Sequence, residues 1–140
     1  MQAFELVEKI PAPPEQVFGV LADHRGLADW TSAREVVLRQ EGDPPPNGLG
    51  AIRVVRTSGL AVEEEITGFD PPKRLSYRIS GGLPIRDHRA EIQVAPHADG
   101  SEVRWIVSFR PRIPGTGALL AFLIRRGLQD MLLRLSRHAF

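Results

Sequence analysis

The C-terminal segment, Gly117–Phe140, constrains the fold more than any other stretch, because it is the only long run with clear helical periodicity. Thr116 directly precedes it as an N-cap candidate, and the Pro114-Gly115 pair ends whatever comes before. At 100° per residue its apolar side chains form one narrow stripe, made of Leu120, Ile124, Leu128, Met131 and Leu135. A long amphipathic helix needs an apolar surface to cover, so the rest of the chain is expected to supply that surface.

The sequence before this helix predicts one strand, two short helices and six further strands. Phe4–Ile10 alternates as a strand, and Glu15–Ala22 is a short helix with Pro14 in its first turn. Asp23 is placed to cap a second short helix that ends at Trp30. Six alternating runs follow, separated by short turns rich in glycine and proline: Val36–Gln40, Ala51–Arg56, Ala61–Phe69, Arg74–Ser80, His88–Ala95 and Glu102–Arg110. Such short connections predict an antiparallel, largely sequential sheet.

One sheet and one long helix must cover each other, because no other predicted element is large enough. An antiparallel sheet of this size twists and curls around the helix. A single helix does not fill the hollow of a strongly curved sheet, so the element count alone predicts an internal cavity. At 140 residues the chain is expected to form a single domain, residues 1–140.

Composition and motifs exclude several classes of function. The chain has no cysteine, which rules out disulfides, thiolate metal sites and cysteine catalysis. A net charge of +1 with dispersed basic residues argues against nucleic acid as a partner. No His, Asp or Glu cluster has metal-ligand spacing and no glycine loop precedes a helix, so neither a metal nor a cofactor is expected.

The sequence also predicts a cytoplasmic protein with no integral membrane segment. Its first ten residues lack the basic and apolar regions of a signal peptide. Its longest apolar run, Ala118 to Ile124, is seven residues, against the roughly 20 that span a bilayer.

Three stretches of the chain carry a resemblance to a known family. They are PEQVFGVLAD (residues 14–23) with Trp30, EEITGFDPPKRLSY (residues 64–77), and GSEVRW (residues 100–105) with Phe109. Together with the order of elements, they resemble the START-like (SRPBCC) superfamily and its polyketide cyclase/dehydrase branch, over essentially the whole chain. The resemblance implies an α+β helix-grip fold: a curved seven-stranded antiparallel sheet wrapped around the long C-terminal helix, with two short helices after the first strand.

The same resemblance implies a deep hydrophobic cavity that binds lipids, sterols or polyketides, and in some members catalyses cyclisation or dehydration. Alternation along each strand then predicts which side chains face that cavity, because successive residues point to opposite faces of a sheet. The apolar set of each strand is taken as the inner one, and Trp30 and the inner side of the C-terminal helix are added to it. The predicted lining is then Trp30, Ile52, Val54, Glu64, Tyr77, His88, Trp105, Phe109, Ile124, Gly127, Leu128 and Met131.

Three polar residues lie on otherwise apolar strand faces, and each has two interpretations. Glu64, desolvated among valine and isoleucine, is a candidate general acid or base, and His88 is a candidate to share its proton. The alternative for Glu64 is a hydrogen bond to the backbone or to an arginine such as Arg53, at a strand end near water. The alternative for His88 is a place at the cavity mouth, and for Tyr77 it is a hydroxyl anchored to a neighbour while the ring packs.

Trp30 and Trp105 are large residues that either close the core between helices and sheet or form an aromatic wall for a planar ligand, and both interpretations can hold together. Gly127 costs about 1 kcal/mol relative to alanine inside a helix. It therefore marks either close packing or room left for a ligand.

Three functional hypotheses follow. The first is a protein that binds a hydrophobic small molecule with a polar group, as a monomer or homodimer. The second is a cyclase or dehydratase that uses Glu64 and His88 for proton transfer, without a metal or nucleotide cofactor. The third is an interaction protein that uses the outer face of the C-terminal helix. There Leu119, Phe122 and Leu133 are expected to pack on the short helices or form a dimer contact, with a membrane surface as the less favoured alternative.

Overall fold

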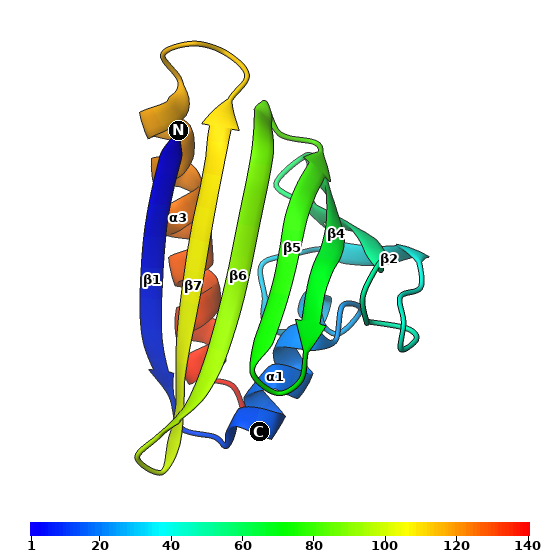
Figure 1. Cartoon of the computed structure of the whole chain (residues 1–140), viewed down its shortest axis with the longest axis vertical. Coiled ribbons are helices and arrows are strands. Elements are labelled where there is room, and N and C mark those ends of the chain that lie inside the picture. The colour runs from blue at the N-terminus through cyan, green and yellow to red at the C-terminus, as the bar shows by residue number, and fades with distance from the viewer.

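The computed structural model describes all 140 residues, as one seven-stranded antiparallel sheet and three helices (Figure 1). The elements follow the order β1 (Gln2–Ile10), α1 (Pro14–Ala22), α2 (Leu27–Trp30), β2 (Glu35–Gln40), β3 (Ile52–Thr57), β4 (Leu60–Asp70), β5 (Arg74–Gly81), β6 (Ile85–His97), β7 (Gly100–Pro111) and α3 (Gly117–Ser136). In the sheet the order is β1-β7-β6-β5-β4-β3-β2, so β2 to β7 pair sequentially and β1 pairs with β7. The predicted helix-grip fold is confirmed.

Helix boundaries differ from the prediction in two places. The second short helix begins at Leu27, because the Asp23 carboxylate accepts the N–H of Gly26 at 3.2 Å and closes a turn before the helix. The long helix ends at Ser136, which makes it about 30 Å long. Thr116 occupies the N-cap position, but its hydroxyl donates to the carbonyl of Ile113 at 2.6 Å and does not cap the helix. None of the three helices is long and apolar enough to span a bilayer.

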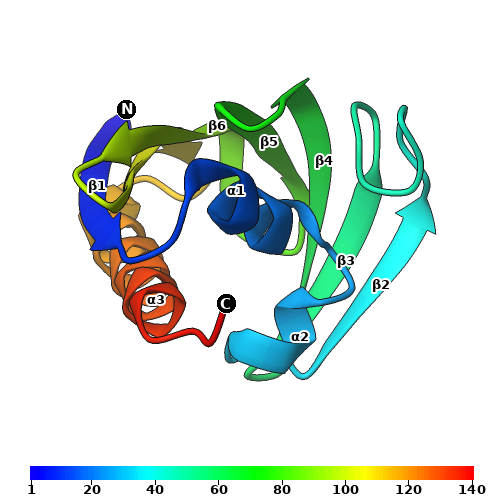
Figure 2. The ribbon, with the colours of Figure 1, turned by 90° about the horizontal axis from the view of Figure 1, so that it is seen from below.

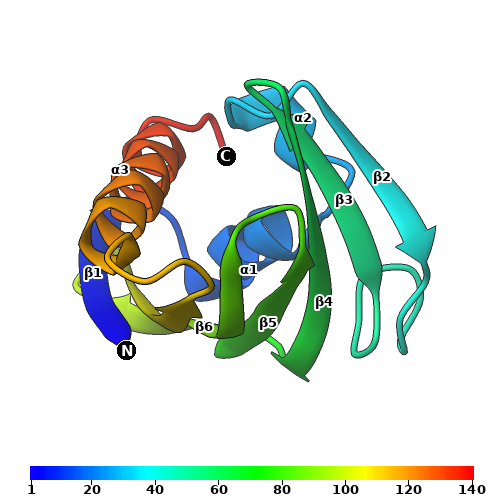
Figure 3. The same ribbon diagram turned by 90° about the horizontal axis from the view of Figure 1, so that it is seen from above.

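The strands follow an arc, and all three helices lie on its concave side (Figures 2 and 3). Helix α3 runs along β1 at one end of the arc, while α2 lies near β2 and β3 at the other end. Helix α1 sits between them and packs on β6 and β7. The ring of Phe18 on α1 meets Phe69 of β4 edge to face, with the two centroids 5.6 Å apart. The long helix therefore covers only one end of the curved sheet.

The inner face of α3 divides into a buried part and a partly open part. Leu135 of the predicted stripe is fully buried, and so is Leu132, which lies outside that stripe. The other stripe residues are only partly buried and pack at the border of the core: Leu120, Ile124, Leu128 and Met131. Their side of the helix looks into space that the sheet leaves unfilled.

The second apolar set of α3 does not pack as expected. Leu119, Phe122 and Leu133 are 61, 58 and 47% exposed. The expectation that they pack on the short helices is wrong, because α1 and α2 lie on the other side of α3, inside the arc of strands.

Candidate functional site: a cavity between the sheet and the long helix

A cavity of about 200 Å³ lies between α3, α2 and the inner face of the sheet. Seven residues of the predicted lining do line it: Glu64, Tyr77, Trp105, Ile124, Gly127, Leu128 and Met131. The remaining wall is mostly apolar and includes Leu27, Ala33, Val55, Val62, Ile79, Leu83 and Leu123. The curved sheet and the offset helix thus leave an apolar space, as the element count predicted.

The lining predicted from β3 is wrong by one residue. Arg53, Val55 and Thr57 face the cavity, whereas Ile52 and Val54 do not line it. The prediction placed the charged residue on the wet face, but the Arg53 side chain is only 6% exposed. Burial of an arginine is tolerated when its charge is paired, and the register supplies the partner: Arg53 lies directly opposite Glu64 on β4.

Arg53 and Glu64 form a buried ion pair on the cavity wall. The Nε–H of Arg53 donates to Oε1 of Glu64 at 2.8 Å, and a terminal guanidinium nitrogen lies 2.6 Å from the same oxygen. Of the alternatives expected for Glu64, the hydrogen bond to Arg53 is therefore confirmed. Its second oxygen, Oε2, accepts no hydrogen bond from the chain, although Glu64 lines the cavity. The site therefore keeps one free acceptor beside a positive charge.

A buried histidine supports the other side of this arginine. His24 is fully buried, and its Nδ1 lies 2.7 Å from a terminal nitrogen of Arg53. An arginine only donates, so Nδ1 accepts, and Nε2 carries the proton that reaches the carbonyl of Asn47 at 3.0 Å. Burial and the adjacent Arg53 charge lower the pKa of His24 to about 3, which keeps the ring neutral. Loop, histidine, arginine and carboxylate thus form one continuous network.

Nothing in the sequence marked His24 as a partner of Arg53. The two are 29 residues apart, and Asn47 lies in the turn-rich loop between β2 and β3. Only the fold brings them together.

Tyr77 forms the floor of the cavity between this network and the tryptophan strand. Its hydroxyl accepts the indole N–H of Trp105 at 3.2 Å, and the Arg53 guanidinium lies 5.6 Å from the centre of its ring. The expected anchoring of the hydroxyl is confirmed. Burial and the nearby Glu64 raise the pKa of Tyr77, so the phenol keeps its proton. That proton has no acceptor in the chain and remains available to a ligand.

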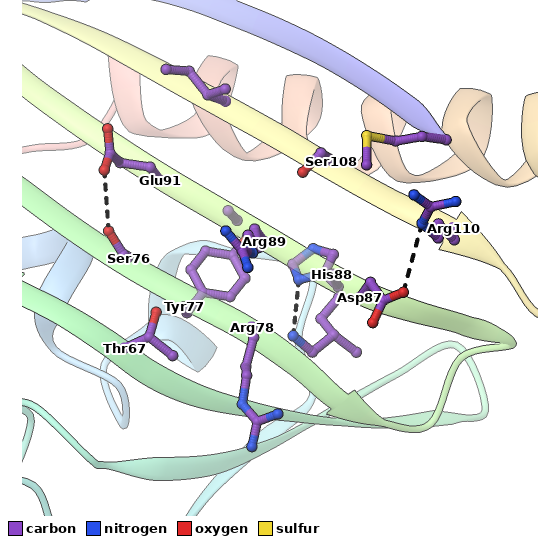
Figure 4. Close-up of a pocket in the computed structure, with 14 residues that line it drawn as sticks. Thr67, Ser76, Tyr77, Arg78, Asp87, His88, Arg89, Glu91, Ser108 and Arg110 are labelled. Carbon is purple, nitrogen blue, oxygen red and sulfur yellow. Dashed lines mark hydrogen bonds and ion pairs between the residues drawn. The ribbon is translucent and has the colours of Figure 1, made fainter.

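His88 has a structural role in the sheet and does not line the cavity. The pairing of β5 with β6 ends at Tyr77 and Ala90, and beyond it the Nδ1 atom of His88 accepts the backbone N–H of Ile79 at 2.9 Å (Figure 4). Burial lowers the pKa of His88 to about 4, consistent with a neutral acceptor. Glu64 and His88 are therefore not brought into one cavity.

His88 instead lines a groove on the outer face of the sheet, which Figure 4 shows in close-up. This groove, about 1050 Å³, is larger than the inner cavity, but most of the residues that line it are polar. Two of its arginines already have partners: Arg78 lies 2.7 Å from Glu65, and Arg110 lies 3.7 Å from Asp87. Apolar ligands bind in pockets with mostly apolar walls, so the smaller inner cavity is the better candidate site.

Two predicted lining residues belong to the packing around the site. Phe109 is fully buried in the core and does not line the cavity. Trp30 also lies outside the lining, and its ring meets His138 of the C-terminal tail at 6.3 Å between centroids. The indole N–H of Trp30 is buried without a hydrogen-bond partner. Of the two tryptophans, only Trp105 forms cavity wall.

Of the two interpretations of Gly127, close packing or open space, the structure shows open space. A Cβ atom added there would have no other atom within 4 Å, so the close-packing interpretation is wrong. Leu123, one turn earlier, also lines the cavity but is 53% exposed, which places the cavity mouth along this edge of α3. No three His, Asp or Glu side chains lie close enough together to hold a metal ion, and the cavity presents apolar surface with one ion pair.

Comparison with solved structures finds the same fold in several proteins. The protein XoxI from Bacillus cereus is 20% identical, with a TM-score of 0.82 over 98% of this chain and 94% of that one. A START superfamily protein from Mycobacterium smegmatis is 10% identical, with a TM-score of 0.80 over 96% and 94% of the two chains. DynU16, from the dynemicin biosynthetic locus, is 22% identical, with a TM-score of 0.71 over 98% of this chain and 46% of that chain.

A comparison with curated proteins finds no match. The sequence model of the family described as "Polyketide cyclase / dehydrase and lipid transport" matches residues 1–139. That match covers nearly the whole chain and agrees with the helix-grip fold and the apolar cavity. The chain therefore belongs to the polyketide cyclase/dehydrase and lipid transport family.

Proposed function

We propose that this protein binds an apolar or aromatic small molecule in the cavity between its sheet and α3. The observation that carries the proposal is the cavity itself: an apolar space of about 200 Å³ that contains a single buried ion pair. Ligand sites of this type combine apolar walls with a few polar groups that set orientation. Membership of a family described by polyketide and lipid chemistry supports the same class of ligand.

The cavity size limits the ligand. An engineered apolar cavity of about 150 Å³ accommodates benzene. A space of about 200 Å³ therefore suits one or two fused rings, or an apolar segment of similar bulk. A longer ligand would extend through the mouth beside Leu123 and Gly127, where the wall is open.

The polar groups limit it further. Glu64 Oε2 offers a free acceptor, and the Tyr77 hydroxyl offers a free donor. A ligand hydroxyl satisfies either group, because a hydroxyl both donates and accepts. A ligand without a hydroxyl would bury these two groups of the protein without a hydrogen-bond partner, which costs affinity. We therefore expect an aromatic alcohol to bind more tightly than the hydrocarbon of the same shape.

Proton transfer between Glu64 and His88 gains no support from this geometry. Glu64 lines the cavity and is held by Arg53, whereas His88 does not line the cavity and accepts the backbone N–H of Ile79. General acid–base catalysis needs groups within hydrogen-bond reach of one substrate, so the binding function is the better conclusion.

The proposal is tested by isothermal titration calorimetry with 2-naphthol, a two-ring probe with one hydroxyl, and naphthalene as the comparison. We expect saturable one-to-one binding that is tighter for 2-naphthol. Gly127→Leu fills the open space at the cavity edge and should weaken binding at least about tenfold, or about 1.4 kcal/mol.

Gly127→Ala is the matched control, because one methyl group leaves most of the space free. Equal affinity for all three proteins, or no binding of either probe by the wild type, would contradict the proposal. Circular dichroism of each variant establishes that its fold is intact.

A further inference from the structure

The outer face of α3 is covered by no other element (Figures 2 and 3) and carries exposed apolar side chains. Leu119, Phe122, Leu123 and Arg126 follow the spacing that places side chains next to one another on a helix. The three apolar residues are 61, 58 and 53% exposed. Leu133, two turns beyond Arg126, continues the surface and is 47% exposed. Adjacent exposed apolar side chains of this size mark an interaction surface rather than scattered solvent contacts.

The same helix carries a net positive charge. Residues 117–137 contain four arginines and one acidic residue, whereas the whole chain has a net charge of only +1. The remainder of the molecule is therefore net negative. Asp130 forms an ion pair with Arg134, whose Nε lies 2.8 Å from the carboxylate. Arg126 and Arg137 are exposed and form no ion pair, so their charges are available to a partner.

We propose that the outer face of α3 docks on the surface of a bilayer that contains anionic lipid. Leucine and phenylalanine side chains enter the boundary between headgroups and acyl chains, and arginines beside them are attracted to anionic headgroups. A helix lying flat on the surface satisfies its own backbone, so docking requires no spanning segment. The charge pattern favours this partner over a second copy of the chain, because a two-fold contact between identical faces brings arginine-rich surfaces together.

The position of Leu123 links this face to the cavity. Leu123 is exposed on the outer side of α3 and also lines the cavity. Docking by this face therefore turns the cavity mouth toward the membrane. The docking itself depends on the helix surface alone and does not require that the cavity be occupied.

Vesicle co-sedimentation tests the proposal. The full chain is mixed with vesicles of phosphatidylglycerol and phosphatidylcholine, with pure phosphatidylcholine as the uncharged surface. We expect binding to the anionic vesicles that weakens as salt is raised, because the attraction between exposed charges is screened. Phe122→Glu should reduce the bound fraction at least about tenfold, and Arg126→Gln should reduce it less while flattening the salt dependence.

Val7→Glu is the matched control. It introduces the same charge at a residue of similar exposure, 47%, on β1, and should bind vesicles like the wild type. Phe122 does not line the cavity, so Phe122→Glu should keep the affinity for 2-naphthol.

Three results would overturn the proposal: no binding to anionic vesicles, equal binding to both vesicle types, or an equal loss in Val7→Glu and Phe122→Glu. A concentration-dependent dimer in analytical ultracentrifugation that Phe122→Glu abolishes, without vesicle binding, would assign this face to self-association instead.

Discussion

Arg53 holds Glu64 on the cavity wall through an ion pair, and His24 accepts a hydrogen bond from the same guanidinium. His24 and Arg53 are buried and Glu64 is partly buried, and the hydrogen bonds between them satisfy polar groups that have little access to water. The Glu64 and Arg53 side chains are only 13 and 6% exposed, so their pairing is far less screened by solvent than that of the surface pairs. Removing one partner from such a pair leaves a buried charge uncompensated.

At the residue scale we therefore predict that Glu64→Leu lowers the free energy of unfolding by about 3 kcal/mol, because Arg53 keeps its charge without a counterion. Urea denaturation at neutral pH measures this. Glu63→Leu is the neighbouring control: Glu63 pairs with Arg39, whose side chain is 59% exposed, and its loss should cost less than about 1 kcal/mol. Equal losses in the two variants would show that the Arg53–Glu64 pair is effectively solvated.

The same residues explain which part of the site the sequence could not predict. Alternation along β4, β5 and β7 correctly placed Glu64, Tyr77 and Trp105 on the cavity wall. On β3 the run Ile52-Arg-Val-Val-Arg offers apolar residues on both faces, so the rule that charged residues face water selected the wrong one. What buries Arg53 is its register with Glu64 and a histidine that only the tertiary fold supplies.

At the scale of elements, α3 performs three tasks with two faces. On its inner face Leu132 and Leu135 pack into the core, and Ile124 and Met131 line the cavity. On its outer face Leu119 and its neighbours remain exposed. Helical periodicity predicted the stripe, but it could not predict that the helix lies toward one end of the sheet. That offset leaves Gly127 without neighbours and so creates the cavity mouth.

Two glycines in different elements should therefore respond to alanine in opposite ways. Gly127→Ala gains helix propensity in open space and should raise stability by up to about 1 kcal/mol. Gly100 begins β7, and a Cβ there would lie 2.3 Å from the carbonyl oxygen of Ile10, so Gly100→Ala should lower stability by about 1–3 kcal/mol. Thermal unfolding of the two variants measures both signs. A stability loss in Gly127→Ala would mean that the mouth of the cavity is closed in solution.

At the scale of the whole molecule, two buried histidines link stability to pH. Burial is the main cause that lowers the pKa of His24 to about 3 and of His88 to about 4, from 6.5. Between about pH 4 and 6.5 the unfolded chain binds protons at both sites and the folded chain does not. Stability is therefore fully present above pH 6.5 and falls as the pH is lowered.

We predict that each histidine contributes up to about 1.4 kcal/mol per pH unit to this fall. Urea denaturation at pH 7 and at about pH 5.5 measures the slope. His88→Asn keeps an acceptor for the N–H of Ile79 but does not titrate, and should remove about half of the pH dependence. An unchanged slope in His88→Asn would show that His88 is not buried as a neutral acceptor.

The overall architecture was largely predictable, because it depends on local signals that agree with one another. Short turns between alternating runs predicted the antiparallel order, and one long amphipathic helix predicted what covers the sheet. The place of His88 was not predictable. It depends on the point at which β5 and β6 stop pairing, and on a bulge in β6 between Arg86 and Arg89.

The central claim, that the inner cavity is the ligand site, is tested most directly by nuclear magnetic resonance of protein labelled with ¹³C at its methionine methyl groups. The chain has only two methionines: Met131 lines the inner cavity, and Met1 lines the outer groove. On titration with 2-naphthol, the Met131 signal should shift saturably in the ring current of the probe while the Met1 signal stays fixed. A shift of Met1 alone, or no shift of either signal, would contradict the account.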